Sequence, residues 1–281
     1  MDISVIIATL GGEQLTRAIV QLNNGKVVPK EILVCIPKEE ASLVDKLAFD
    51  NVRLIVVDGR GQVKQRSIGF HLAKYPVVMQ MDDDIFLSED ALEILLHNLM
   101  ILGKGNALAP AYRNVSTGRP IHDLGDGWSG LLKSIFAFLV IGAPWGLSRM
   151  GRATKIGVCY GVNVDCCANE PFKTDWLPGG CVLCLKEDLI LENFYPFNGK
   201  AYSEDVIHSS LRHKREVSHW VIPSAICTIE STNFEFNSNT REAQKYVARL
   251  MNGSSLRIEI YFLIIRLTSY LRIRLKKWLN N

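Results

Sequence analysis

The sequence predicts an α/β fold: a doubly wound, mostly parallel sheet with flanking helices, followed by a C-terminal helical tail. Short apolar, β-branched runs alternate with segments of helical periodicity through the first hundred residues. These runs lack the polar alternation of half-exposed strands, as expected for strands that are covered on both faces. Acidic residues stand where two of the runs end.

The first hundred residues predict four strands and four helices in strict alternation. The expected strands are 3–9, 31–37, 52–58 and 76–81, and the expected helices are 13–24, 39–49, 62–73 and 88–100. In the first helix Leu15, Ala18, Ile19 and Leu22 follow the i, i+3, i+4, i+7 spacing. Ser88 is the expected N-cap of the fourth helix, because acidic residues follow it in the first turn.

The second half of the chain is less regular. Glycine, proline and asparagine interrupt residues 101–170, and no elements can be assigned there. A strand is expected at 181–185, and a helix is expected within 198–215 with Ser203 as its N-cap.

Composition favours a globular protein of a reducing compartment. The 281 residues are 48% hydrophobic and 22% charged, enough for a core in one large domain or two small ones. The 32 basic and 29 acidic residues are nearly balanced, so we expect no nucleic-acid partner. Seven cysteines, several in apolar runs, predict free thiols rather than a disulfide framework. The spacing of Cys181 and Cys184 is also found in zinc sites, but both lie in a predicted strand, so we expect no zinc.

The first residues read as a strand and not as a secretory signal, so the expected location is the cytoplasm. The apolar segment 131–147 contains Lys133 and Pro144 and barely reaches the length of a membrane span, so we expect no transmembrane helix there.

Three consecutive acids, Asp82-Asp83-Asp84, follow the fourth predicted strand, and Asp58 ends the third. In doubly wound sheets, ligands bind outside the carboxyl ends of the strands. Asp82 and Asp84 can face the same way on an extended segment, and Mg²⁺ or Mn²⁺ prefers carboxylate ligands. We therefore interpret this pair as a metal site; the alternative is a solvated acidic turn. Glu204 and Asp205 open a predicted helix, where stabilisation of the helix dipole would also explain them.

Five segments together resemble the inverting family-2 glycosyltransferases with the GT-A fold, over residues 2–230. In chain order the segments are "ISVIIATLGGEQLTRAI", "RGQVKQRSIGF", "MQMDDDIFLSEDAL", "DWLPGGCVLCLKEDL" and "YSEDVIHSSLRHK". They are similar, respectively, to the family's opening strand and helix, its basic helix, its Asp-x-Asp segment, its acceptor-side Trp-Gly segment and its Glu-Asp catalytic segment.

The resemblance implies a role for each matching residue. Asp84 and Asp82 would hold the metal bound to the nucleotide diphosphate, with Asp82 and Asp83 also near the nucleotide. Asp205 would be the catalytic base and Glu204 its partner. Further residues expected beside the nucleotide are Thr9, Lys64 and Arg66, and those expected on the acceptor side are Trp176, Gly179 and Gly180.

Two positions depart from the family pattern. The second predicted strand ends in "CIPKEE" without the aspartate that usually recognises the base, so Glu39 or Asp58 would take that place. Where the family often has a histidine after the last core strand, this chain has Glu230, which could contribute to metal binding.

The expected function is the metal-dependent inverting transfer of a sugar from a nucleotide diphosphate-sugar to a hydroxyl of a glycan or lipid-linked glycan, in surface polysaccharide synthesis. Such a transfer needs one base for the acceptor hydroxyl and one cation for the leaving diphosphate. The alternatives are a sugar-1-phosphate nucleotidylyltransferase and a non-catalytic GT-A scaffold. The expected glycosyltransferase domain is 1–235, with a nucleotide-binding half at 1–100 and an acceptor-side half at 101–235.

Residues 236–281 form the expected helical tail. Its segment 254–281 combines an apolar core with Arg272, Arg274, Lys276, Lys277 and Trp278. Basic residues favour anionic lipid and tryptophan favours the membrane interface. We therefore expect the tail to attach the protein peripherally to the inner face of the plasma membrane. The alternative is a helix that packs on the catalytic domain or on a partner.

Overall fold

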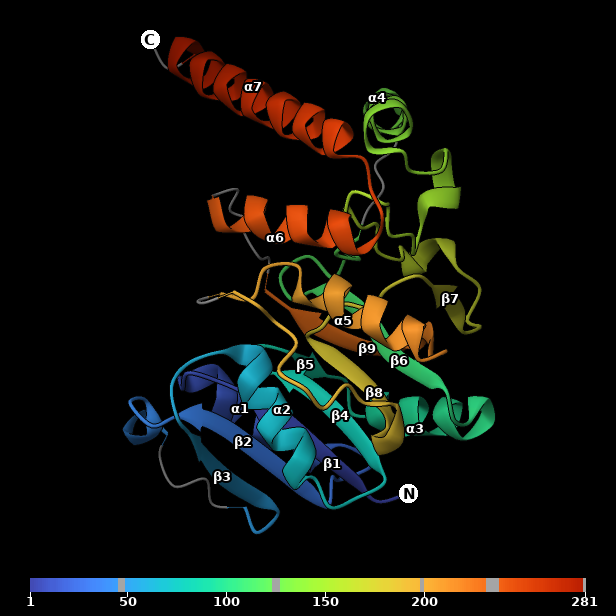
Figure 1. Ribbon diagram of the computed structural model, residues 1–281. Helices are drawn as coiled ribbons and strands as arrows, with labels where there is room; N and C mark the ends of the chain where they lie inside the picture. The colour runs from blue at the N-terminus through green and yellow to red at the C-terminus, as the bar shows by residue number, and fades with distance from the viewer. Residues whose placement is uncertain (45–48, 123–126, 198–199, 231–237, 280–281) are drawn as a thin grey trace.

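The computed structural model describes residues 1–44, 49–122, 127–197, 200–230 and 238–279. One sheet of nine strands forms the centre of the protein, and α6 lies between this sheet and an outer layer made by α4 and α7 (Figure 1). The helices are α1 Glu13–Asn24, α2 Gln62–Leu72, α3 Ala91–Leu102, α4 Gly127–Phe136, α5 Glu204–Lys214, α6 Ser238–Leu250 and α7 Ser255–Leu279. The strands are β1 Ile3–Ala8, β2 Glu31–Pro37, β3 Val52–Val57, β4 Val77–Asp82, β5 Phe86–Leu87, β6 Asn106–Asn114, β7 Phe172–Thr174, β8 Cys181–Leu185 and β9 Ser218–Ile229.

The strand order is β3-β2-β1-β4-β8-β6-β9-β5, with β7 paired to β9. Strands β1 to β4 are parallel, as the alternation of strands and helices predicts. Strand β8 runs antiparallel to both β4 and β6, and β9 is parallel to β6. The carboxyl ends of β1, β3, β4 and β9 therefore meet at one edge of the sheet.

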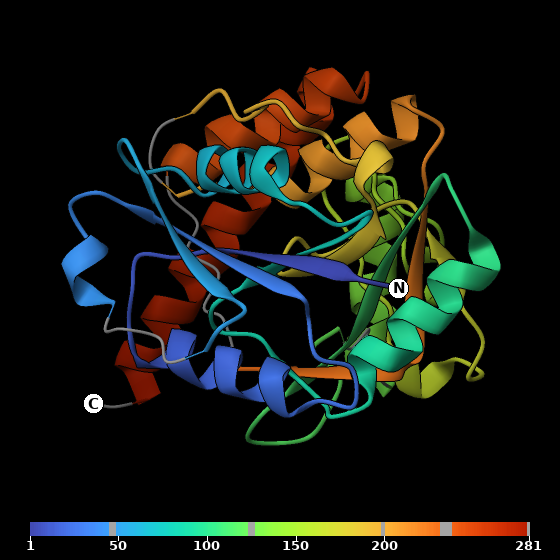
Figure 2. The same cartoon turned by 90° about the horizontal axis from the view of Figure 1, so that it is seen from below.

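Helices cover both faces of the sheet: α1 and α3 lie on one face, and α2 and α5 on the other (Figure 2). Alternate residues of β1 pack on opposite faces, with Val5 and Ile7 in the core under α1 and Ile6 in the core under α2. Every residue of β1 and β2 is buried, which explains why their sequences are continuous apolar runs.

The predicted second helix, 39–49, is wrong over its described part. Residues 41–43 form a short 3₁₀ turn, and residues 45–48 lie outside the described ranges. The neighbouring Glu40 is buried and ion-paired to Arg60, so a tertiary contact overrides the local helical pattern. Leu54 and Val56, which lie on the same face of β3, stay exposed.

Of the two predicted helix caps, Ser88 and Ser203, the first differs from the structure. The strand β5 keeps the chain extended through Leu87, and the Ser88 hydroxyl donates a hydrogen bond to Asp90, which takes the N-cap position of α3. Ser203 does occupy the N-cap position of α5, but its side chain makes no capping hydrogen bond.

The region without sequence assignments contains β6 and α4. Helix α4 continues as a π-helix, Ala137–Ile141, and α7 packs against this continuation through Ile258 and Phe262. Within the described ranges, no helix is both long enough and apolar enough to cross a bilayer. The predicted domain boundary after residue 235 falls in 231–237, outside the described residues, and stays a prediction.

Candidate active site

The predicted acidic residues lie at the edge of the sheet where the parallel strands end. Asp82 is the last residue of β4, and its backbone N–H donates to the carbonyl of Gly180 at 2.7 Å, just before β8 begins. Thr9 follows β1, and Glu230 follows β9. Three separate segments of the chain therefore bring polar side chains to this edge, beside the backbone of Gly180.

Arg66 connects the two halves of this site. Its guanidinium is almost fully buried; Nη1 donates to Glu204 Oε1 at 2.6 Å, and Nη2 donates to Asp82 Oδ1. Gln62, one turn earlier on α2, donates to the same Asp82 oxygen at 2.9 Å. The Asp-x-Asp segment and the start of α5 are 122 positions apart in sequence (82 to 204), and this one side chain fixes them relative to each other.

Gly179 and Gly180 allow this close approach. A Cβ on Gly179 would overlap Glu204 Oε1, and a Cβ on Gly180 would lie 3.3 Å from Asp82 Oδ2. The carbonyl of Gly179 is held by Gln80, a buried β4 residue whose Nε2 donates to it at 2.6 Å. A side chain at position 179 would therefore displace the Glu204 carboxylate from its place beside Arg66.

Asp205 has the properties of a base that works near neutral pH. Burial, and after it the neighbouring Glu204 charge, raises the pKa of its carboxyl to about 7, while Arg66 opposes the shift. The side chain keeps some exposure to solvent, and its Oδ1 accepts from the Val206 N–H at 2.9 Å. The preceding Ser203 has φ 57°, a left-handed conformation that is strained for serine. This turn places Glu204 and Asp205 at the first two positions of α5.

Asp83 and Asp84 have different surroundings. Asp83 accepts a hydrogen bond from the Thr9 hydroxyl, whose oxygen in turn accepts from the Gly11 N–H at 2.9 Å. Burial, together with the charges of Asp82, Asp83 and Glu230, raises the pKa of Asp84 to about 6. The Asp84 carboxylate thus lies among like charges, an arrangement that a bound cation would stabilise.

These carboxylates fit a divalent cation that also binds a diphosphate. Among the described residues, no group of three or more His, Cys, Asp or Glu side chains is arranged to hold a metal ion alone. Mg²⁺ and Mn²⁺ commonly take only one or two carboxylates, with phosphate oxygens and water as the other ligands. Asp84 is available for this, and Asp82 has Oδ2 left after Arg66 and Gln62 bind Oδ1.

The remaining predicted residues lie at the margins of this site. Lys64 donates to the backbone carbonyl of Asp58, and neither contacts the acidic cluster. Lys64 lines a polar cavity of about 230 Å³ together with Gln62 and Tyr195. Trp176 is buried, and its Nε1 donates to the Tyr160 carbonyl at 3.0 Å, so it packs inside the acceptor-side half.

Sequence reasoning missed Gln62 and Gln80. Gln80 carried a usable signal, because a lone polar residue inside a predicted buried strand must find a hydrogen-bond partner. Gln62 carried none, since a glutamine at the start of a helix is usually solvated.

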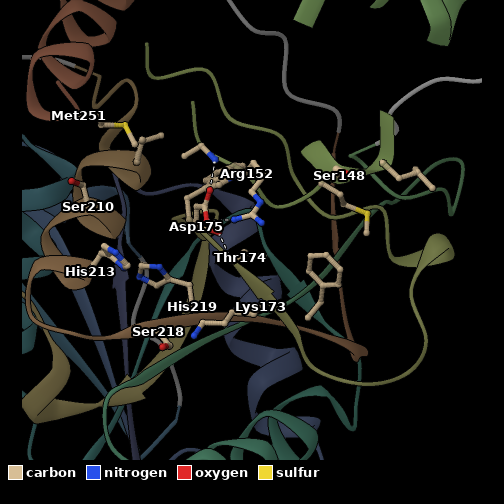
Figure 3. A pocket seen from close by; sticks show the side chains of 16 residues that line it. Ser148, Arg152, Lys173, Thr174, Asp175, Ser210, His213, Ser218, His219 and Met251 are labelled. Atoms are coloured by element: carbon tan, nitrogen blue, oxygen red, sulfur yellow. Dashed lines mark hydrogen bonds and ion pairs between the residues drawn. The ribbon is translucent and has the colours of Figure 1, made fainter. Parts of the chain in front are cut away.

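A larger cavity of about 610 Å³ extends along α5 (Figure 3). Val206, Ser210 and His213 line it from one face of α5, beginning next to Asp205. Arg152, Lys173, Asp175 and His219 also line it; His219 lies beside His213, and Arg152 Nη1 donates to Asp175 Oδ1 at 3.1 Å. Burial lowers the pKa of His219 to about 3, so this histidine is neutral. Among the described residues that line the cavity, the charged side chains are those of Arg152, Lys173 and Asp175, so positive charge predominates.

Comparison with known proteins identifies the fold. No family model and no curated protein sequence matches the chain. Among solved structures, it is similar to GalNAc-T7 crystallised with UDP, GalNAc and Mn²⁺, with a TM-score of 0.63 and 16% identity over 89% of this chain. It is also similar to S. aureus TarS 1–349 in complex with UDP-GlcNAc, with a TM-score of 0.52 and 14% identity over 89% of this chain. This chain has the GT-A fold. The fold expected from the resemblance is therefore confirmed.

The chain spans 48% of the GalNAc-T7 chain and 66% of the TarS chain. At these identities the likeness concerns the GT-A fold alone. The roles of the individual residues therefore depend on the geometry described above.

Proposed function

We propose that this protein is a metal-dependent, inverting glycosyltransferase that uses a nucleotide diphosphate-sugar donor. The observation that carries the proposal is the Arg66 bridge. It holds the Asp-x-Asp segment and the Glu204-Asp205 pair in one site, with a carboxyl of pKa about 7 beside an acidic cluster suited to a cation. Both similar structures contain UDP or a UDP-sugar, and one contains Mn²⁺, which supports the proposed donor and metal.

Asp205 is the proposed general base. As the acceptor oxygen attacks the anomeric carbon, its proton passes to the Asp205 carboxylate, the bond from the anomeric carbon to the phosphate oxygen breaks, and the nucleoside diphosphate leaves. One displacement inverts the anomeric configuration and needs no carboxylate nucleophile. Glu204, fixed by Arg66, acts as a positioning residue that raises the pKa of Asp205.

The leaving diphosphate carries negative charge that the acidic cluster alone would repel. A Mn²⁺ or Mg²⁺ ion held by Asp84 and Asp82 would neutralise that charge. Asp83, kept in place by Thr9, completes the donor side. Lys64 and Gln62 line the neighbouring 230 Å³ cavity, and Lys64 donates to the carbonyl of Asp58; we propose that the nucleotide extends in this direction.

The 610 Å³ cavity is the proposed acceptor site. It is lined by Trp176 and by Val206, the residue that follows the base in sequence, and its volume is in the range of small-molecule sites. A glycan or lipid-linked glycan of a surface polysaccharide, acting on the cytoplasmic side of the plasma membrane, is the acceptor class we propose. The basic groups Arg152, Lys173 and His213 suit an acceptor that carries negative charge.

Incubation with a panel of nucleotide sugars and Mn²⁺ tests the function. A transferase slowly hydrolyses its donor and releases the nucleoside diphosphate, and chelation of the metal abolishes the release. Asp84→Asn should lose the activity, whereas Glu89→Gln, which changes an exposed acid on the same segment, should keep it. Formation of pyrophosphate from a nucleoside triphosphate and a sugar 1-phosphate would identify a nucleotidylyltransferase instead. The absence of both reactions with every donor would favour a non-catalytic scaffold.

A further inference from the structure

We propose that α4, its π-helical continuation and α7 together form a docking surface for an anionic lipid bilayer. This surface, called here the docking layer, consists of residues 131–147 and 256–267. The sequence assigned membrane attachment to the C-terminal tail alone; the structure adds a second segment more than a hundred residues away. The proposal depends on the proposed function only where it concerns the acceptor.

Exposed apolar side chains are concentrated in the docking layer. Of the 22 large hydrophobic residues that are exposed among the described residues, 11 lie in these two segments. The 11 residues are Leu131, Leu132, Ile135, Phe138, Leu139, Trp145, Leu147, Leu256, Ile260, Leu263 and Leu267. Two short segments thus hold half of the exposed apolar side chains, a concentration that marks an interaction site.

On α7 the exposed residues form one stripe. Leu256, Ile260, Leu263 and Leu267 follow the i, i+4, i+7, i+11 spacing of a single helical face. Ile258 and Phe262 on the other side are buried. The helix therefore has two apolar faces, of which the protein covers only one.

The two segments form one structural unit. Ile141 of the π-helix packs with Ile258 and Phe262 of α7, and the rings of Phe136 and Tyr261 lie 6.5 Å apart. In Figure 1 this unit lies beyond α6, on the side of the protein away from the sheet. The exposed side chains of both segments therefore belong to the outermost layer.

The charge of these segments favours an anionic surface. The docking layer contains three basic residues, Lys133, Arg257 and Arg266, and one acidic residue, a net charge of +2, and four more basic residues follow it in the sequence at 272–277. The single acid, Glu259, is ion-paired to Arg241 and Lys245 of α6. Two copies of such a surface would repel each other, whereas an anionic leaflet attracts it.

The aromatic residues suit the interface between lipid and water. The exposed rings of Phe138 and Trp145 contact each other edge to face, with centroids 6.1 Å apart. Tryptophan is enriched at the level of the lipid headgroups. With charged residues inside both apolar segments, the docking layer would lie on the bilayer rather than cross it.

The docking layer also borders the proposed acceptor cavity. Leu147, at its edge, and the adjacent Ser148 line the 610 Å³ cavity, as does Met251 just before α7. Docking would bring this side of the cavity toward the headgroups. If the proposed function holds, the acceptor is therefore a glycan anchored to lipid, presented from the membrane.

Flotation of the full chain with lipid vesicles tests the docking. The protein should float with vesicles of phosphatidylcholine and phosphatidylglycerol, and much less with phosphatidylcholine alone or at high salt. Leu132→Ser/Leu139→Ser/Leu263→Ser should weaken binding about tenfold or more, because it removes three exposed apolar groups. Met100→Ser/Ile101→Ser, which changes similarly exposed residues on α3, is the matched control and should bind like the unchanged protein.

Equal binding by the triple variant and the unchanged protein would overturn the proposal, as would no binding to anionic vesicles. If the triple variant instead changed the molar mass in solution and not the flotation, the surface would be a contact between copies of the chain. Donor hydrolysis without vesicles should be the same for all three proteins. Its absence in all of them would refute the proposed function, while flotation would still decide the docking.

Discussion

Asp205→Asn is expected to stabilise the fold, and to do so only as the pH rises. In the folded protein, burial and Glu204 raise the pKa of Asp205 from 3.8 to about 7. Between these values the folded state holds a proton that the unfolded state has lost, so the free energy of unfolding decreases as the pH increases. At about 1.4 kcal/mol per pKa unit, this decrease amounts to at most about 4 kcal/mol by pH 8. Asparagine cannot ionise and avoids the loss.

Urea unfolding at about pH 5 and about pH 8 measures this effect. The variant should exceed the unchanged protein by about 1–4 kcal/mol at the higher pH and by clearly less at the lower pH. Asp50→Asn, at an exposed carboxylate before β3, is the control and should show no such pH dependence. A stability difference for Asp205→Asn that is the same at both pH values would refute the raised pKa, and with it the argument for a base tuned to neutral pH.

Three further substitutions test the rest of the site. Arg66→Met should destabilise the fold by about 3–5 kcal/mol in urea unfolding, because it leaves the buried Glu204 and the Asp82 carboxylates unpaired; a loss below about 1 kcal/mol would mean that the bridge is loose. Gly179→Ala should push Glu204 away from Arg66 and reduce kcat at least about tenfold, with a smaller effect on donor KM; full activity would show that the close approach is not needed. Asp84→Asn should abolish Mn²⁺-dependent binding of a nucleoside diphosphate in calorimetric titration, while the protein stays folded and at least as stable in urea as the unchanged protein, because the raised pKa of Asp84 disfavours the folded state at neutral pH; unaltered affinity would indicate a solvated turn.

The parallel half of the sheet was predictable because its strands are buried on both faces. Such strands must be continuous apolar runs, and the run 3–9 is one of them. The predicted helix 39–49 failed where Glu40 pairs with Arg60, a contact that no local pattern reveals. The elements within 101–170 were not assigned because glycine and proline interrupt the periodicity that signals them.

The sequence indicated acidic residues of the candidate site, but it did not indicate which side chains contact each other there. Acids at strand and helix ends indicated Asp82, Asp84 and Asp205. The Arg66 bridge joins positions 138 residues apart, which a single sequence cannot show. The docking layer was hidden for the same reason, since α4 and α7 meet only in the folded chain.

The pH dependence of donor hydrolysis tests most directly whether Asp205 is the base. With saturating donor and Mn²⁺, the rate of nucleoside diphosphate release should rise with pH to an apparent pKa near 7 and then level off. Asp205→Asn should bind the donor normally, lose about a hundredfold or more in rate, and lose the inflection. A variant that keeps the rate within about tenfold and the same pH profile would contradict the account, because the proton would then be accepted elsewhere.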